Sequence, residues 1–355
     1  MHGAIRETEA LTPGLFTKEE ARMGGRIDFV IPWVDGQDPT WRDEKSRYAP
    51  EGLVDDGEAR YRDWGLLPYW FRGVEKYAPW VRKIHFVTWG HLPAWLHTKA
   101  PKLHIVRHED FIPEQFLPVF SSNPLETHLH RIPGLSERFV YFNDDLMLLR
   151  PVKESDFFCG RKPRDLLALQ PVIANPSNPV MSKILLNNSL ILSRYFKKRE
   201  TRRRHTGKYF HPGYPWKYFV YNLLELAFPQ YTGLYTVHGP SPLLKSTFKE
   251  VWEREEEYLK EVSSHRFRSG DDVNQYLFRE WEKQKGNFVP ANLHRDYQYL
   301  YLDDPKKKYL QVIRRQEKKI VCVNDTDLSG SFEKTRKELI AAFASILPEK
   351  SSFEK

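Results

Sequence analysis

The stretch Arg138–Arg150, RFVYFNDDLMLLR, predicts a buried strand that ends in a cluster of polar side chains. Phe139–Phe142 are apolar, Asn143-Asp144-Asp145 follow, and Leu146–Leu149 are apolar again. Two carboxylates between hydrophobic segments repel each other and are costly to desolvate unless a cation lies between them. Mg²⁺ favours one or two carboxylates together with phosphate oxygens. The alternative is that Asn143 and Asp144 only end a strand in a turn, and this stretch alone leaves both open.

Composition and charge set bounds on the function. The chain has 355 residues, of which 40% are hydrophobic and 14% aromatic, so one large domain or two smaller ones would fit. A formal net charge of +8 fits anionic partners: nucleotide sugars, acidic polysaccharide, anionic lipid or nucleic acid. The two cysteines, Cys159 and Cys322, give no disulfide framework, as is typical of a reducing compartment. The start has no signal-peptide pattern, and no apolar run approaches the ~18–20 residues of a membrane helix, so we expect a cytoplasmic protein.

Strand and helix patterns alternate along the first half of the chain and predict a mostly parallel α/β sheet. Strand patterns occupy residues 27–34, 83–89, 103–107 and 139–142, and a helical pattern covers Leu66–Tyr77. The first strand runs into the turn Asp35-Gly36-Gln37-Asp38-Pro39. Open α/β sheets place ligand contacts outside the carboxyl ends of their strands, although Asp-Gly is also a common turn.

Further polar clusters follow in the second half. His238 lies between a strand pattern and Gly239-Pro240, where a general base or phosphate contact is one interpretation and a structural loop residue the other. Arg268 lies in HRFRSGDD, before a helix whose N-terminus offers anion-binding N–H groups; pairing with a surface carboxylate is the alternative. The strand pattern Ile320–Val323 ends in Asn324-Asp325, which repeats the opening motif. The run Lys197–His205 is either solvated surface or a landing site for a polyanionic acceptor or an anionic membrane.

Four stretches, in this order, resemble the conserved regions of the Stealth family: residues 27–41, about 61–158, 238–272 and 322–326. Members of this family are sugar-1-phosphate transferases that make bacterial capsular and cell-surface phosphoglycans, and they are related to the catalytic part of the lysosomal-enzyme N-acetylglucosamine-1-phosphotransferase. The chain departs from the family pattern at Arg62–Leu67 and at Trp89, near the expected nucleotide-sugar pocket. These departures concern the identity of the donor more than the type of reaction.

The resemblance implies a Rossmann-like, mostly parallel sheet similar to the GT-A-like core of nucleotide-sugar transferases, with helical additions. It implies transfer of a hexose-1-phosphate or N-acetylhexosamine-1-phosphate from a UDP-sugar to a hydroxyl of a glycan or lipid-linked oligosaccharide, with release of UMP. The cofactor would be Mg²⁺ or Mn²⁺. The alternatives are a metal-dependent glycosyltransferase that releases UDP and a non-catalytic polyanion binder. We expect no nucleic-acid partner, and at most peripheral contact with the inner face of the bacterial membrane.

On the matching positions, the resemblance assigns roles to individual residues. Asp144 and Asp145 would hold the cation and the diphosphate, and Asp145 is also counted as catalytic. His238 or Asp35 would activate the acceptor hydroxyl, and Arg268 would stabilise charge on the transferred phosphate. Asn324 and Asp325 would close the site from the C-terminal side, and Asp38 and Asn143 are second choices as substrate contacts, with the shaping of turns as their alternative role. The expected organisation is a loose arm (1–25), a catalytic domain (26–330, with 151–237 as an acceptor-side insertion) and a C-terminal amphipathic helix with its tail (331–355).

Overall fold

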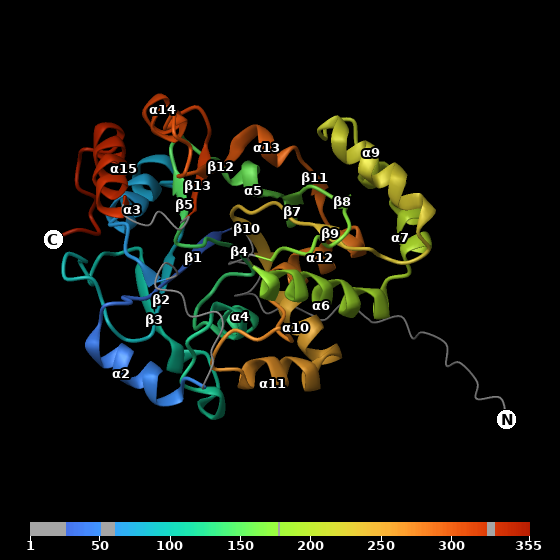
Figure 1. The fold of residues 1–355 in the computed structure, drawn as a ribbon, viewed down its shortest axis with the longest axis horizontal. Coiled ribbons are helices and arrows are strands. Elements are labelled where there is room, and N and C mark those ends of the chain that lie inside the picture. The colour runs from blue at the N-terminus through green and yellow to red at the C-terminus, as the bar shows by residue number, and fades with distance from the viewer. Residues whose placement is uncertain (1–25, 51–60, 177, 325–330) are drawn as a thin grey trace.

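The computed structural model describes residues 26–50, 61–176, 178–324 and 331–355 (Figure 1). Within these residues the main sheet has five strands in the order β10-β4-β1-β2-β3. Strands β1, β2, β3 and β4 are mutually parallel, whereas the edge strand β10 runs antiparallel to β4. Their bounds are Ile27–Trp33 (β1), Ile84–Thr88 (β2), Leu103–Arg107 (β3), Arg138–Tyr141 (β4) and Ser241–Leu244 (β10). The predicted α/β class with a mostly parallel sheet is therefore confirmed.

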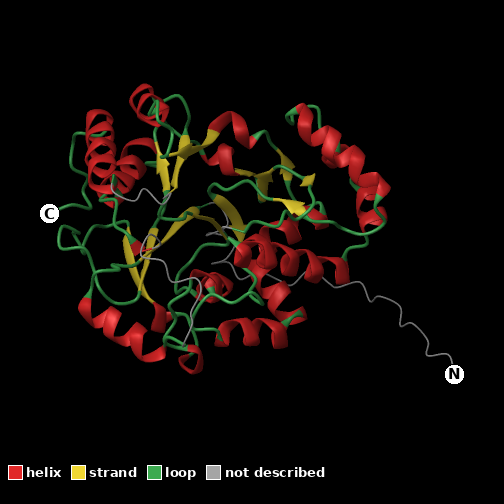
Figure 2. Cartoon of the chain, in the orientation of Figure 1, coloured by secondary structure: helices red, strands yellow, loops and turns green. Residues whose placement is uncertain are grey.

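Both faces of this sheet are buried, which explains why β1 is a continuous apolar run and not an alternating one. Ile27, Phe29 and Ile31 point into one apolar cluster, while Val30 points into the other. The first cluster includes side chains of the helices α3 (Leu67–Tyr77) and α15 (Phe332–Ile346). The second includes side chains of α4 (Ser122–Thr127), α10 (Lys245–Arg254) and α11 (Glu256–Ser264). Figure 2 shows helices on both sides of the strands.

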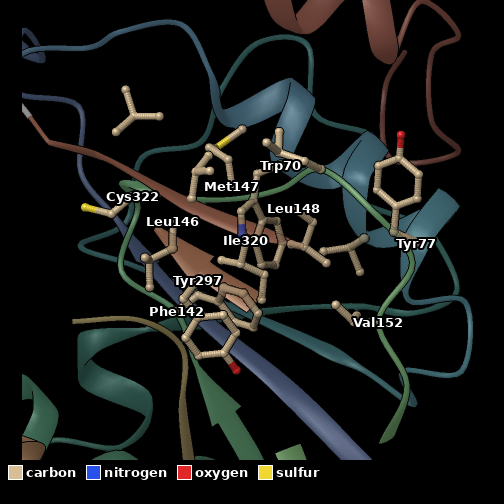
Figure 3. Packing of buried hydrophobic residues seen from close by; sticks show 14 of the residues in the cluster. Trp70, Tyr77, Phe142, Leu146, Met147, Leu148, Val152, Tyr297, Ile320 and Cys322 are labelled. Carbon is tan, nitrogen blue, oxygen red and sulfur yellow. The ribbon is translucent and has the colours of Figure 1, made fainter. Parts of the chain in front are cut away.

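A second, three-stranded sheet continues directly from the first. Strand β5 begins immediately after Asn143-Asp144-Asp145 and pairs antiparallel with β13, which pairs parallel with β12. Trp70 and Tyr77 of α3 pack on this sheet beside Leu148 and Ile320 (Figure 3). The bounds are Leu146–Leu148 (β5), Tyr297–Tyr301 (β12) and Ile320–Asn324 (β13). The polar cluster of the opening motif thus lies at the junction of two sheets.

The remaining strands are short. Strands β6, β7 and β11 form a third sheet, and β8 pairs with β9. Their bounds are Phe158–Cys159 (β6), Lys162–Asp165 (β7), Ala168–Leu169 (β8), Leu234–Tyr235 (β9) and Val289–Pro290 (β11).

Helices occupy much of the rest of the described chain. Their bounds are Pro39–Tyr48 (α2), Leu67–Tyr77 (α3), Ser122–Thr127 (α4), Glu154–Phe157 (α5), Pro179–Tyr195 (α6), Lys198–Arg204 (α7), Thr206–Tyr209 (α8), Trp216–Leu224 (α9), Lys245–Arg254 (α10), Glu256–Ser264 (α11), Tyr276–Lys285 (α12), Leu293–Asp296 (α13), Lys308–Arg315 (α14) and Phe332–Ile346 (α15). In the part of the chain that the structure describes, no helix has both the length and the apolar character needed to cross a bilayer. The expected arm, residues 1–25, lies outside the described residues, and the division into domains stays a prediction.

Candidate active site

The sheet topology brings three segments that are distant in the sequence to the end of the sheet at which β4 finishes. Asn143-Asp144-Asp145 leave the carboxyl end of β4. Strand β10 is antiparallel to β4, with Ser241 opposite Tyr141. The residues just before β10, His238 among them, therefore lie beside the carboxyl end of β4. Strand β13 places Cys322 opposite Leu146, next to Asp145. Asp145, His238 and Cys322 therefore meet, although 93 and 177 positions separate Asp145 from the other two.

Asp145 is the centre of this cluster. Its Oδ2 lies 3.1 Å from Nε2 of His238 and accepts a hydrogen bond of 3.1 Å from Sγ of Cys322. Its Oδ1 is buried and has no hydrogen-bond partner among the described residues. The other ring nitrogen of His238, Nδ1, lies 2.9 Å from the hydroxyl of Tyr276, at the start of α12. His238 is thus fixed from both sides, with Asp145 and Tyr276 as its partners.

Titration behaviour in the cluster follows from these contacts. The electrostatic influence of Tyr276 and the hydrogen bond to Asp145 raise the pKa of His238 well above its ordinary value, against the effect of burial. Burial, and then the charge of Asp145, raise the pKa of the Cys322 thiol to about 12. The Asp144 residue is exposed to solvent, while desolvation of its carboxyl group by nearby protein and the charge of Asp145 raise its pKa to about 7. Two adjacent carboxyl groups of this kind resist being ionised together.

A cavity of about 250 Å³ opens beside the cluster. Asn143, Asp144 and Arg268 line it, so the structure brings together three of the residues proposed from the sequence. Glu126 closes part of the cavity wall and accepts hydrogen bonds from the Tyr141 hydroxyl at 3.0 Å and from the Gln275 N–H at 2.9 Å. Burial raises the pKa of Glu126 to about 7. Aromatic side chains form much of the remaining wall: Trp33, Trp41, Tyr61, Phe120 and Phe267.

The loop that carries Arg268 is held by a buried carboxylate, Asp272. This side chain accepts hydrogen bonds from Nδ2 of Asn123 at 2.8 Å and from the Ser269 N–H at 3.0 Å, and it lies 2.7 Å from Nδ1 of His265. Phe267 stacks on Phe120, with ring centroids 5.3 Å apart. These contacts fix the backbone on both sides of Arg268. Sequence reasoning placed the function in this loop but gave Asp272 no role.

Contacts within the turn after β1 engage the carboxylates of both Asp35 and Asp38. The Asp35 N–H donates to Nε2 of His91 at 2.7 Å, and the Asp35 carboxylate accepts from the Gln37 N–H at 2.9 Å. Asp38 caps α2 by accepting from the Trp41 N–H at 2.8 Å. Neither carboxylate is among the residues that line the cavity. The structure therefore gives both side chains a role within the turn, and it does not bring Asp35 into the His238 cluster.

The C-terminal side of the cluster is formed by β12 and β13. The ring of Tyr299 packs against His238, with centroids 6.1 Å apart, and Tyr301 packs on Tyr299 at 5.1 Å. Asn324 ends β13 opposite Tyr301. Tyr301 is 63% exposed, so the pair offers an open aromatic surface beside His238. Asp325 lies outside the described residues.

Comparison with known proteins identifies the family. Models of the Stealth protein conserved regions 1, 2 and 3 match residues 25–52, 60–165 and 237–277. A capsular polysaccharide phosphotransferase, WcwK, of Streptococcus pneumoniae is 42% identical over 94% of this chain and 100% of its own length. The chain belongs to the Stealth family.

Other relatives of this Stealth protein have related names. The receptor polysaccharide phosphotransferase WefC of Streptococcus oralis is 38% identical, covering 93% of this chain and 99% of its own. The exopolysaccharide phosphotransferase cps2G of Lactiplantibacillus plantarum is 34% identical over 93% and 96%. This Stealth protein is accordingly a transferase of phosphorus-containing groups. Among solved structures, the galactosyltransferase LgtC aligns over 88% of this chain and 95% of its own, with 10% identity and a TM-score of 0.38, a likeness too weak to bear on function.

The site of this Stealth protein fits a divalent cation. Among the described residues, Oδ1 of Asp145 is buried without a hydrogen-bond partner, and the neighbouring charge of Asp145 contributes to the raised pKa of Asp144. Both observations indicate that a cation beside the two carboxyl groups would be favourable. Carboxylate oxygens suit Mg²⁺ or Mn²⁺. The ligand atoms of Asp145, His238 and Cys322, all within 4.8 Å of one another, form a second donor set, of the nitrogen and sulfur type that zinc prefers. A metal at that set would have to displace the protons of the Cys322 thiol and of His238, whose pKa values are both raised in its absence.

Proposed function

We propose that this Stealth protein transfers a sugar 1-phosphate from a UDP-sugar to a hydroxyl group of a capsular or cell-surface polysaccharide and releases UMP. The proposal rests on one observation: the cavity and the His238 cluster meet at the neighbouring residues Asp144 and Asp145. Asp144 lines a cavity that also contains Arg268, and Asp145 holds His238, a proton acceptor, just outside it. Phosphoryl transfer needs charge neutralisation and positioning, together with a group that takes a proton from the nucleophile.

The cavity is proposed as the donor site. Its aromatic walls, including Phe267 stacked on Phe120, suit a nucleobase and a ribose, and Arg268 suits the oxygens of a diphosphate. Asp144 and Asp145 would hold a divalent cation, which supplies neutralisation of the diphosphate when bound. Asn143 lines the same cavity and is proposed as a substrate contact, whereas Asp38 is proposed to shape the turn.

The acceptor is proposed to enter from the side of Tyr299 and Tyr301, since exposed aromatic rings beside His238 can stack on a sugar ring. Its hydroxyl oxygen attacks the β-phosphorus, and the proton passes to His238. The bond between the β-phosphorus and the oxygen bridging to the α-phosphorus breaks, and UMP leaves. Asn324, at the end of β13, borders the acceptor side. We propose His238 and not Asp35 as the base, because Asp35 is engaged within its own turn.

The leaving nucleotide tests this function. Incubation of the protein with a panel of UDP-sugars, Mg²⁺ and an acceptor glycan should yield UMP, detected by chromatography, in proportion to phosphodiester product. UDP as the sole nucleotide product would favour a glycosyltransferase that attacks the anomeric carbon. Binding of polyanionic glycans without any turnover, unchanged by Asp144→Ala, would favour a non-catalytic binder.

A further inference from the structure

Helix α9 turns the polar residue Asn222 inward, and its one charged residue, Lys217, is exposed. The side chain of Asn222 accepts a hydrogen bond from the Leu169 N–H at 2.7 Å and donates to the Leu167 and Tyr209 carbonyl oxygens at 3.2 and 2.7 Å. Glu225, just after the helix, is buried and pairs with Lys198 at 2.7 Å. An ordinary surface helix has the opposite arrangement, with an apolar face inward and a polar face toward water.

Apart from Lys217, the outward face of α9 and of the turn that follows it is mostly apolar. Trp216 is 78% exposed, Leu224 63% and Phe228 51%. Trp216, Phe219 and Leu223 follow one another at the three- and four-residue spacing that places side chains on one side of a helix. The exposed apolar set is Trp216, Phe219, Leu223, Leu224, Leu226 and Phe228. Single exposed apolar residues are ordinary, but six within this short stretch form a patch of the kind that marks a binding surface.

A basic helix lies beside this patch. The buried Lys198 of α7 donates to the Glu225 carboxylate and to the Gln230 carbonyl at 2.9 Å, and it thereby fixes α7 to the end of α9. Arg199, Arg203 and Arg204 of α7 are exposed, and no carboxylate of the described residues pairs with them. Figure 1 shows α7 and α9 together at the edge of the molecule opposite the C-terminus.

We propose that α9 and α7 form a docking surface for an anionic lipid bilayer. The apolar face of α9 would enter the region between headgroups and acyl chains, and the arginines of α7 would contact anionic headgroups. The leucines argue against a glycan as the occupant, because sugar stacking uses aromatic rings and gains nothing from leucine side chains. The arginines argue against a second copy of the chain, because an isologous contact would bring like charges together. The inference does not depend on the proposed reaction, since none of these residues lies in the candidate active site.

Vesicle flotation with the full-length chain tests the proposal. We expect the protein to float with vesicles of phosphatidylcholine and phosphatidylglycerol, less with phosphatidylcholine alone, and less at high salt. The variant Leu223→Ser/Leu224→Ser and the variant Arg199→Gln/Arg203→Gln/Arg204→Gln should each lower the partition coefficient about tenfold or more. Because these side chains are exposed, the thermal unfolding temperature should stay unchanged, and circular dichroism checks this.

Two matched controls localise the effect. Leu186→Ser/Leu190→Ser removes two equally exposed leucines from α6, and Lys308→Gln/Arg314→Gln/Arg315→Gln removes three exposed charges from α14. Both should bind vesicles as the parent protein does. Equal loss in the controls, or no flotation of the parent protein, would overturn the proposal. A dimer in sedimentation velocity that Leu223→Ser/Leu224→Ser dissociates, without vesicle binding, would assign α9 to a second copy instead.

Discussion

The two oxygens of the Asp145 carboxylate have different surroundings. Oδ2 is shared by His238 and Cys322, whereas Oδ1 is buried without a partner among the described residues. If Asp145 both orients His238 and binds a cation, Asp145→Asn should lower the rate of UMP release about 100-fold or more with little change in stability. The exposed Asp303 offers a matched control, and Asp303→Asn should keep full activity. An active Asp145→Asn enzyme would show that the cluster is structural.

Substitution of Tyr276 tests the role of His238 separately, through the pKa of His238. Because its influence raises the pKa of His238, Tyr276→Phe should lower that pKa. A base must be deprotonated to act, so activity rises with pH through the pKa of the base. We therefore expect the acidic limb of kcat/KM to lie above pH 6.5 in the parent enzyme and to move to lower pH in the variant. A limb that does not move would assign the pH dependence to another group.

Asp144 links pH to cation binding. Its folded pKa of about 7 lies above the ordinary value of 3.8, so its protonated form stabilises the fold, and this stability is lost as pH rises from about 4 through about 7. A cation that binds the ionised carboxyl restores it. Mg²⁺ should therefore raise the unfolding temperature more at about pH 8 than at about pH 5.5, and Asp144→Asn should remove this difference. An equal Mg²⁺ effect at both pH values would place the cation elsewhere.

At the residue scale, the local pattern was enough to nominate Asn143, Asp144, Asp145, His238 and Arg268, because each follows a strand pattern or precedes a helix. It was not enough to find their partners. Tyr276 and Cys322 are 38 and 177 positions away from the residues they contact. The placement of α12 brings Tyr276 to His238, and the register of β13 with β5 brings Cys322 to Asp145. In the sequence, Cys322 is one position of the strand pattern 320–323, and no local motif marks Tyr276.

Helix α12 shows how far an element can differ from its sequence pattern. Its charged residues, including Arg279, Glu280 and Lys283, are typical of a solvated helix, yet all three are buried. The reason is that they bind the segment that leads to His238. Arg279 donates to the Val237 carbonyl at 3.0 Å, Lys283 donates to the Tyr235 carbonyl at 3.3 Å, and Glu280 accepts from Thr236 at 2.5 Å.

The contribution of the ion pair between Arg279 and Asp165 to the free energy of unfolding can be measured. Burial raises the pKa of Asp165, but the charges of Arg279 and Lys283 lower it below its ordinary value. Arg279→Met leaves the buried Asp165 without the two hydrogen bonds of 2.5 and 2.8 Å that Arg279 donates, so the free energy of unfolding should fall by about 3–5 kcal/mol in urea. Arg279→Met/Asp165→Leu should recover much of this loss. A loss below about 1 kcal/mol in the single variant would mean that the pair is not buried in solution.

Other elements also could not be predicted correctly from the sequence without the tertiary structure. The sequence from Ser246 to Glu261 alone predicts one helix, whereas the structure has two, α10 and α11, which meet at Glu255. No strand pattern covers the proline-containing stretch Ser241–Leu244, yet it forms strand β10. Proline is tolerated there because β10 lies at the edge of the sheet. The strands 27–34 and 83–89 were predictable because buried parallel strands are short apolar runs, whatever their partners, and the partly buried strand 103–107 still carries Leu103, Ile105 and Val106.

At the scale of the whole molecule, the C-terminal residues pack on the first half of the chain. Phe353 is 3% exposed and lies 5.1 Å from Phe71 of α3, in the apolar cluster that also contains β1 and α15. Its carbonyl accepts from the His97 N–H at 2.8 Å, and Arg72 pairs with Glu354 at 2.7 Å. A helix and tail that fold as a separate unit would not share a core with the central strand of the sheet.

Because residues 331–355 share a core with the main sheet, we expect the two to unfold together. Phe353→Ala should lower the free energy of unfolding by about 3–5 kcal/mol, because a buried aromatic side chain leaves a cavity against Phe71. If 331–355 and the main sheet unfold together, circular dichroism and the rate of UMP release should be lost at the same urea concentration, shifted equally in the variant. The exposed Glu349 gives the control, since Glu349→Ala removes a side chain of the same segment without burial. Retention of UMP release after the circular dichroism of the helix has melted would instead support the predicted boundary at 330/331.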